Sequence, residues 1–389
     1  KVTDMLYKCY ELASESENFD EYFQMIKDRY NNIIADLGLK DFSLDEDFEI
    51  IKGAFAHMAG RDYAASRGEY LNSKVLAKYL GFAGKYIFFD DQGNFDWTKT
   101  EAKLAPKLAK TNKAVIPGFY GSMPNGTIKT FSRGGSDVTG SIVARATKAK
   151  LYENWTDVSG CLICDPRIVN NPEPIKTITY RELRELAYMG ATVLHEDAIF
   201  PVRAAGIPVN IKNTNQPEDR GTMIVSESAE HCDHIITGIA GKKGMSVINI
   251  EKDKMNSEIG FGKNVLRALE KSNVSFEHMP SGVDTMSVVI ATEALAGKET
   301  AIIDEIKSRV HPDQIYIESN LALIAVVGRG MKSARGTAAI LFSALADARV
   351  NIKMIDQGSS ELNIIVGVEE EDFEVAIKAI YKRFIGINQ

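Results

Sequence analysis

The chain has little of what membrane-spanning, disulfide-built or nucleic-acid-binding proteins need. It has 4 cysteines among 389 residues, without framework spacing, and no run near the roughly 20 apolar residues that cross a bilayer. It has no basic run either, and its net charge of −7 argues against a surface that grips phosphates. These absences favour a cytoplasmic protein that binds neither membrane nor nucleic acid.

An initiator methionine and a signal peptide are also missing, because the sequence opens with Lys1-Val2-Thr3 and continues at helical spacing. We therefore expect an N-terminal segment to precede Lys1. Cys161-x-x-Cys164 has the spacing of half a zinc site, but no second pair follows, so no metal site is predicted. The length and the 44% hydrophobic and 25% charged content indicate a globular protein of two or three domains.

The most informative stretch is 127–144, TIKTFSRGGSDVTGSIVA. Its β-branched start predicts a strand, and its end predicts a helix that begins near Asp137, with a bend at Arg133-Gly134-Gly135. Glycines let a ligand approach the backbone, and the free N–H groups of a helix start favour an anion. Arg133 can add a bidentate grip on a carboxylate or phosphate. The stretch therefore predicts an anion site, with an ordinary turn and helix cap as the alternative.

The chain changes character near residue 230. Before it, helical patterns over 1–85 are followed by strands alternating with helices, which indicates an α/β domain with a mainly parallel sheet. After it, 260–290 aligns without a gap with 336–366, at an offset of 76 residues. Each copy predicts a strand, a glycine turn, an amphipathic helix and two further strands, so the second half contains a duplicated module.

Several blocks resemble the aspartokinases, within the amino-acid kinase family. In the family's order they are Ser66-Arg67-Gly68-Glu69, the Arg133–Asp137 bend, Trp155-Thr156-Asp157-Val158-Ser159-Gly160, Asp165-Pro166-Arg167 and Met189–His195. The duplicated module resembles the ACT domain. The resemblance implies a catalytic amino-acid kinase domain over 1–230 and a regulatory region of two ferredoxin-like βαββαβ ACT units over 231–389. It also implies that the first ACT unit, about 251–314, is inserted in the second, 235–250 plus 315–389.

Aspartokinases transfer the γ-phosphoryl group of ATP, bound with Mg²⁺, to the side-chain carboxylate of L-aspartate. That carboxylate is already ionised at neutral pH, so the chemistry needs positioning and cationic stabilisation rather than a general base. The resemblance implies that Arg133 and Asp137, with the amides of Gly134 and Gly135, are catalytic. It further implies that Thr3, Glu69, Arg133 and Asp137 bind aspartate, and that Thr156, Asp157 and Arg167 bind ATP. A surface ion pair for Glu69, a helix cap for Asp137 and a structural turn for Arg167 remain the alternatives.

The regulatory half resembles units that bind a feedback amino acid where ACT domains pair. This implies a homodimer through the ACT domains, with further pairing into tetramers left open. Glu277 stands where the second copy has Lys353, which predicts a site for a cationic amino acid in the first copy only. Lysine is the first candidate, threonine the second, and an exposed strand residue is the alternative for Glu277. The residues predicted to line this site are Met255, Gly260, Phe261 and Glu277.

Two features depart from the family pattern. Its N-terminal Lys-Phe-Gly-Gly-Thr-Ser segment, which carries a phosphate-binding lysine, is not in the chain, and Thr192 stands where several relatives have a lysine. Two alternatives therefore stay open: a different amino-acid kinase, and a non-catalytic regulatory protein that binds an amino acid. We expect the encoded sequence upstream of Lys1 to discriminate, because an intact segment there supports the enzyme.

Overall fold

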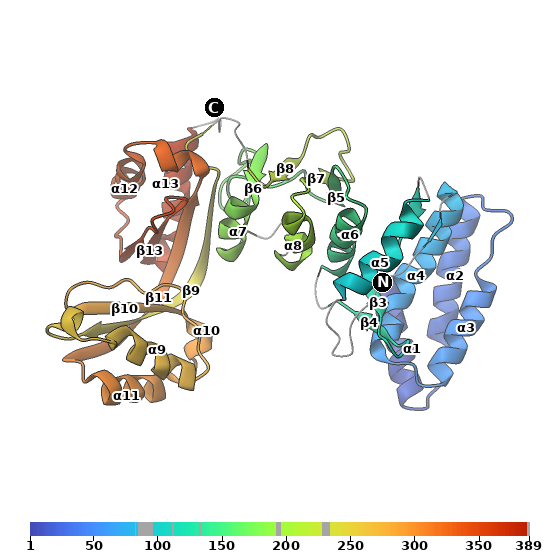
Figure 1. Ribbon diagram of the computed structural model, residues 1–389, viewed down its shortest axis with the longest axis horizontal. Helices are drawn as coiled ribbons and strands as arrows, with labels where there is room; N and C mark the ends of the chain where they lie inside the picture. The colour runs from blue at the N-terminus through green and yellow to red at the C-terminus, as the bar shows by residue number, and fades with distance from the viewer. Residues whose placement is uncertain are drawn as a thin grey trace. The chain divides into compact units, whose positions relative to one another are not determined.

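The computed structural model describes residues 1–386 apart from residues 82, 85–95, 111–112, 132–133, 192–195 and 228–233. Two residues singled out in the sequence, Arg133 and Thr192, lie outside the described residues. The chain divides into two compact units (Figure 1): Lys1–Asn154 with Leu194–Asn210, and Trp155–Val193 with Ile211–Gln389.

The first unit opens with a bundle of helices, as the sequence predicted for 1–85. They are α1 (Val2–Ser14), α2 (Asp20–Asp36), α3 (Asp45–Ala56) and α4 (Arg61–Leu80). Their apolar stripes meet in one core, where the Phe23 ring packs edge to face against Phe48 and Phe55. α4 ends at Gly81, whose left-handed φ of +70° suits a glycine. The bundle thereby fixes α4, the helix that carries Glu69.

Short strands and further helices complete the first unit. β1 (Ala83–Gly84) runs parallel to β2 (Ala114–Val115), and β3 (Tyr120–Ser122) forms an antiparallel hairpin with β4 (Ile128–Thr130). The helices are α5 (Trp97–Leu108), α6 (Gly135–Ala146) and α8 (Glu196–Ala204). α6 follows β4 along the chain, so the predicted strand and helix are both present. The helix begins two residues before Asp137, because Gly134 takes the N-cap position.

A four-stranded sheet has the order β5-β7-β8-β6. Its strands are β5 (Tyr152–Thr156), β7 (Val209–Asn213), β8 (Thr222–Val225) and β6 (Thr177–Thr179). The boundary between the two units falls inside β5 and β7. β6 runs parallel to β8 and leads directly into α7 (Tyr180–Tyr188), which starts at a capping box between Thr179 and Glu182.

A five-stranded sheet in the second unit has the order β10-β9-β11-β13-β12. Two long strands, β9 (Gly238–Glu251) and β11 (Gln314–Val327), pair antiparallel along their length, with irregularities in register between Glu318 and Leu323. The second half of β9 also pairs with β10 (Thr285–Ala291), whereas the second half of β11 pairs with β13 (Asn363–Glu369). β12 (Met354–Asp356) pairs with β13 at the edge. Each long strand therefore contributes to both halves of the sheet.

The internal repeat is present in the structure. α9 (Phe261–Lys271) and α12 (Thr337–Asp347) both start at glycines with left-handed φ, +85° at Gly260 and +88° at Gly336. The second helices of the two halves are α11 (Glu299–Val310) and α13 (Phe373–Ile385). Short helices connect the elements: η1 (Met255–Ser257), α10 (Thr292–Leu295), η2 (Arg329–Ser333) and η3 (Glu370–Asp372).

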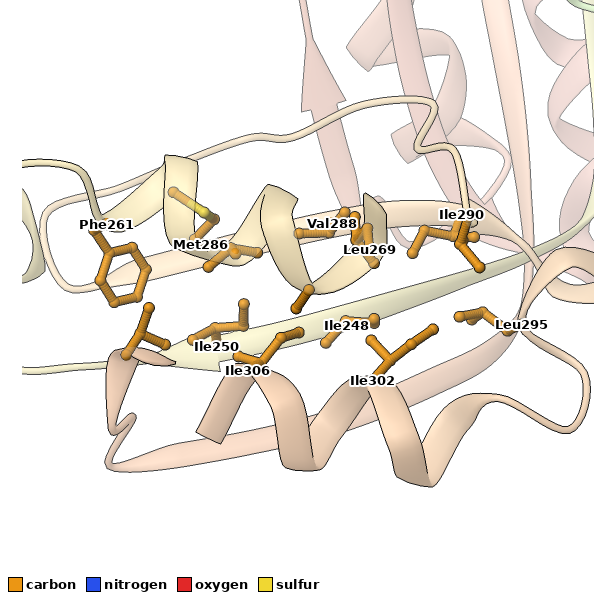
Figure 2. Packing of buried hydrophobic residues seen from close by; sticks show 14 of the residues in the cluster. Ile248, Ile250, Phe261, Leu269, Met286, Val288, Ile290, Leu295, Ile302 and Ile306 are labelled. Carbon is orange, nitrogen blue, oxygen red and sulfur yellow. The ribbon is translucent and has the colours of Figure 1, made fainter. Parts of the chain in front are cut away.

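Figure 2 shows the core of the half built on β9 and β10. Ile248 and Ile250 lie two residues apart on β9 and therefore point to the same face, where they pack with Ile302 and Ile306 of α11. All four side chains are fully buried. Burying an aliphatic side chain of this size contributes about 1.5–3 kcal/mol to folding, so this face helps to hold α11 on the sheet.

Candidate functional site

A pocket of about 400 Å³ lies in the first unit, between α4, the segment after β2, and α6. It is lined by Glu69, Asn72, Ser73, Leu76, Ala114, Val115, Ile116, Pro117, Gly118, Ser136, Thr139, Gly140 and Val143. Its lining joins the Glu69 block of the sequence to the helix that follows the glycine bend. The structure therefore brings together two of the predicted blocks that are more than 60 residues apart in the chain.

Glu69 is the charged residue of this lining. Its Oε2 atom is buried and has no hydrogen-bond partner among the described residues. Burial raises the pKa of Glu69, because the carboxylate loses water without gaining a cation. The surface ion pair considered for this residue is absent from the described part of the chain. An unpaired carboxylate in a pocket of this size is suited to an ammonium group.

The start of α6 is packed closely by its neighbours. A Cβ atom added at Gly135 would lie 2.7 Å from Cδ2 of Phe119 and 2.9 Å from its Cα. Gly134, the N-cap residue, has φ +54° and offers no side-chain cap, so the first N–H groups of α6 are not satisfied by a capping side chain. Both glycines therefore suit a closely packed helix start, and the binding of an anion by its backbone N–H groups stays a prediction.

Asp137 lies in the first turn of α6, and it is not the helix cap. Its Oδ1 accepts a hydrogen bond of 2.9 Å from Nδ2 of Asn154, on β5. The same Nδ2 donates to the hydroxyl of Tyr152 at 3.0 Å, and that hydroxyl donates to the backbone carbonyl of Asp137 at 3.2 Å. Neither Asn154 nor Tyr152 was singled out from the sequence. The only signal was the alternation of β5, which turns the side chains of both residues to one face.

Thr3 lies in α1 and is not among the residues that line the pocket. Asp137, Gly134 and Gly135 are not among them either, although their neighbour Ser136 is. The part played by Thr3 in binding therefore stays a prediction.

The residues predicted to bind nucleotide lie in the second unit. The Thr156 carbonyl accepts hydrogen bonds from the backbone N–H and the hydroxyl of Thr214, at 2.8 and 2.9 Å, and the Asp157 side chain follows on an exposed loop. Gly160 lies against β8, because an added Cβ would fall 2.3 Å from Oγ1 of Thr222. These contacts fix the backbone of the loop and leave Asp157 exposed.

Arg167 is 88% exposed and forms an ion pair with Asp165 at 2.6 Å. Hydrogen bonds from Arg167 hold the pKa of Asp165 below its usual value. This geometry fits the structural turn that the sequence left open, but an exposed pair of this kind is worth little and is easily exchanged for another anion.

Cys161 and Cys164 are buried free thiols in the same loop. Burial raises the pKa of each to about 12, which makes them unreactive at neutral pH. Among the described residues, no group of three or more His, Cys, Asp or Glu side chains could hold a metal ion. The described helices also include none that is long and apolar enough to cross a bilayer.

Three of the residues predicted to bind an effector, Met255, Gly260 and Phe261, lie at or just before the start of α9, whereas Glu277 follows the end of that helix. The side chains of Met255 and Phe261 are buried in the core of the half built on β9 and β10. These two residues can therefore contact a ligand only through their backbone groups. Glu277 is not the exposed strand residue of the alternative, since its side chain is 16% exposed and lies 2.6 Å from Nζ of Lys242. Tyr188, the last residue of α7, also donates a hydrogen bond to Glu277.

The chain matches the profiles of two known families. The profile of the amino acid kinase family matches residues 3–213, and that of an ACT domain matches residues 324–384. The fold is therefore of the amino acid kinase class, with an α/β kinase region followed by ACT-type regulatory structure.

Relatives narrow this class. The chain is 38% identical to aspartokinase 3 of Bacillus subtilis, over 99% of this chain and 88% of that protein. It is 55% identical to the aspartate kinase of Clostridium acetobutylicum, whose crystal structure has a TM-score of 0.90 and covers 99% of this chain and 89% of that chain. Aspartokinase III of Escherichia coli, crystallised with aspartate and ADP, shares the fold at 23% identity, with a TM-score of 0.67 over 98% of this chain and 90% of that one. The chain belongs to the aspartokinases of the amino acid kinase family.

Proposed function

We propose that this chain transfers the γ-phosphoryl group of ATP to the side-chain carboxylate of L-aspartate, giving 4-phospho-L-aspartate and ADP. Membership of the aspartokinases supports the reaction type. The observation that carries the choice of an amino-acid substrate is the buried, unpartnered Oε2 of Glu69 in a pocket of about 400 Å³.

Aspartate brings one ammonium and two carboxylates, and the site has proposed partners for the ammonium and for one carboxylate. Glu69 takes the α-ammonium, which relieves the cost of keeping its own charge buried. The N–H groups at the start of α6 and the Arg133 guanidinium hold a carboxylate, and Asp137 orders the ammonium or the water around it. Thr3 contributes a hydroxyl, as the family pattern predicts.

The nucleophile is a carboxylate that is ionised at neutral pH, so no group has to remove its proton. The protein's task is to hold it in line with the γ-phosphorus and to offset the repulsion between two anions. Thr156 and Asp157 are proposed to line the nucleoside pocket, and Arg167 is proposed to leave Asp165 for the phosphates. When bound with ATP, Mg²⁺ would neutralise charge on the phosphate oxygens. We propose that it arrives with ATP, as Mg²⁺ commonly does.

The regulatory part is proposed to bind a feedback amino acid, lysine first and threonine second, at the start of α9 and beside Glu277. An effector acts only through a difference in affinity between two states of the enzyme. A cationic ligand at Glu277 competes with Lys242 and with the hydrogen bond from Tyr188 of α7. The effector is therefore proposed to weaken a link between the ACT region and the end of α7.

The domain limits 1–230 and 231–389 remain proposals, and the insertion of the first ACT unit in the second is supported by the two long strands, each of which serves both halves of the sheet. A homodimer through the ACT region is supported by large apolar side chains left exposed around α9: Ile259 at 101%, Val283 at 64% and Phe276 at 42%. The free thiols Cys9, Cys161 and Cys164 support a reducing cytoplasm.

The test is an ADP-release assay on the protein made from the complete coding sequence, with L-aspartate, L-glutamate and L-asparagine as acceptors. We expect release that depends on aspartate, together with an acyl phosphate that hydroxylamine traps. Lysine and threonine are then added separately. Release that does not depend on aspartate, or that prefers glutamate, would overturn the proposal.

A further inference from the structure

Asn154 is a buried polar residue in the middle of β5, where a strand would ordinarily place an apolar side chain. It is 6% exposed, and a buried amide without partners costs free energy. Its Nδ2 has two N–H groups, and both are used: one on Oδ1 of Asp137 at 2.9 Å, the other on the Tyr152 hydroxyl at 3.0 Å. The residue therefore has a specific polar task on the face of β5 that meets α6.

The direction of each hydrogen bond in this group follows from chemistry. An ionised carboxylate only accepts, so the amide of Asn154 must present its nitrogen, and not its oxygen, to Asp137. The Tyr152 hydroxyl then accepts from Asn154, and its own hydrogen is left for the Asp137 carbonyl at 3.2 Å. One donor thus holds the Asp137 side chain, and a second holds its backbone.

Two further features tie Tyr152 of β5 to α6. A Cβ added at Gly140 would lie 2.6 Å from the Tyr152 hydroxyl oxygen, so the helix needs a glycine there to admit the tyrosine. Burial raises the pKa of Tyr152 to about 12, and the hydroxyl therefore keeps the hydrogen that it donates. Oδ2 of Asp137 makes no hydrogen bond within the described part of the chain, so one carboxylate oxygen is anchored and the other is available.

We propose that Asn154 is a positioning residue, which acts through Asp137 and aims its free carboxylate oxygen at the substrates, with Tyr152 as its support. The inference rests on the proposed function, because it gives Asp137 a part in phosphoryl transfer to aspartate. A carboxylate on a two-torsion side chain has several rotamers, and an error of ~1 Å in placing a reacting or orienting group costs on the order of 100-fold in rate.

The experiment compares four single variants of the full-length enzyme, Asn154→Leu, Asn154→Asp, Tyr152→Phe and a control, Asn249→Leu, with the double variant that combines Asn154→Leu and Tyr152→Phe. Asn249 is also a strand asparagine, but it accepts a hydrogen bond from Ser287 on the regulatory sheet. Asn154→Leu is expected to lower kcat/KM for aspartate by about 10–100-fold, with KM for ATP nearly unchanged. The control is expected to match the parent when no effector is present.

The order of the two Asn154 variants separates positioning from a structural role. Aspartate has nearly the size of asparagine, so a structural role predicts that Asn154→Asp is the milder change. If Asn154 acts through the Asp137 charge, Asn154→Asp should be the more damaging change, because two carboxylates then face each other. Tyr152→Phe is expected to lose less than Asn154→Leu, and the double variant is expected to lose no more than Asn154→Leu alone, since both act on one group.

Parent-like kcat/KM in Asn154→Leu would overturn the proposal, as would an Asn154→Asp enzyme that is more active than Asn154→Leu. A fully additive loss in the double variant would also contradict it. If the melting curve shows that Asn154→Leu does not fold, the activities of Asn154→Asp and Tyr152→Phe are compared instead. Activity in Asn154→Asp equal to or above that of Tyr152→Phe would overturn the proposal. A parent enzyme without aspartate-dependent ADP release would instead be a failure of the proposed function.

Discussion

The Glu182 carboxylate and the partly buried Arg329 guanidinium form an ion pair, with Oε2 2.8 Å from Nη1. Glu182 is fully buried, and its two oxygens also accept hydrogen bonds from Thr179, Thr237 and the backbone N–H of Arg329. One side chain thus joins the start of α7 to the start of β9 and to the turn after β11. Burial works to raise the pKa of Glu182, but these donors outweigh it, and the pKa lies below its usual value.

Glu182→Gln is expected to lower the free energy of unfolding by about 3–5 kcal/mol, because it leaves Arg329, whose side chain is only 18% exposed, without its counter-charge. Urea denaturation followed by circular dichroism measures the loss. The matched control is Glu185→Gln, also on α7, whose carboxylate accepts one bond from Asn363 at 2.7 Å and should cost about 1 kcal/mol. Equal stability of the two variants would contradict the central place of Glu182.

The same variant gives a prediction for pH. A carboxyl group whose folded pKa is lowered stabilises the fold above its unfolded pKa, and that stabilisation is lost as pH falls through the folded pKa. The difference in stability between the parent and Glu182→Gln should therefore be full at pH 7 and shrink in acid, below about pH 4.3, the ordinary pKa of glutamate. A difference that stays constant from pH 7 to pH 3 would show that the charge is not its source.

Glu69→Gln is expected to separate stability from binding. Because burial raises the pKa of Glu69, its ionised form destabilises the fold at pH 7, and this cost grows as pH rises through the folded pKa. The uncharged variant should therefore melt at or above the parent temperature, while KM for aspartate rises about tenfold or more through loss of a charged hydrogen bond. Glu21→Gln, an exposed residue of α2, is the control. A variant with parent-like KM would remove Glu69 from the substrate site.

Gly160→Ala is expected to damage the nucleotide loop. At φ +102° an alanine is strained by about 1–3 kcal/mol, and its Cβ would in addition lie 2.7 Å from the backbone nitrogen of Thr222, which cannot move aside easily. Gly206→Ala is the matched control, since Gly206 has φ +68° and open space around the added atom. Gly160→Ala should lower the melting temperature and raise KM for ATP more than Gly206→Ala does. Equal effects in the two variants would mean that close packing against β8 does not matter.

Substitutions at Lys242 and at Glu277 are expected to change effector sensitivity in opposite directions. Burial works to raise the pKa of Glu277, but hydrogen bonds from Lys242 and Tyr188 lower it overall, so the carboxylate is ionised and already paired. Glu277→Gln should weaken inhibition by lysine about tenfold or more, whereas Lys242→Met should strengthen it by removing the competing cation. Lys243→Met is the control. In the parent, the Lys243 ammonium lies 5.4 Å from the Phe373 ring centroid. Unchanged half-inhibitory concentrations in both test variants would exclude Glu277 from the effector site.

Much of the local structure could be predicted from the sequence. The helices before residue 81, the helix after the glycine bend and the two helices at an offset of 76 residues all follow from the spacing of apolar residues and from glycines at helix starts. The Glu69 block and the bend could be assigned to one site only by resemblance, since they lie on separate elements. Periodicity reports which face of an element is buried, but it carries no information on what that face will meet.

Sequence alone determined the order of the blocks, the duplication and the chemical types of the residues that the chain offers. Tertiary structure decided the partners: Asn154 for Asp137, Lys242 and Tyr188 for Glu277, and Arg329 for Glu182. The last pair is separated by 147 residues. Such pairings depend on which elements come to lie side by side once the cores form. A side chain's partner, and with it the cost of burying its charge, is therefore set only when the whole fold is in place.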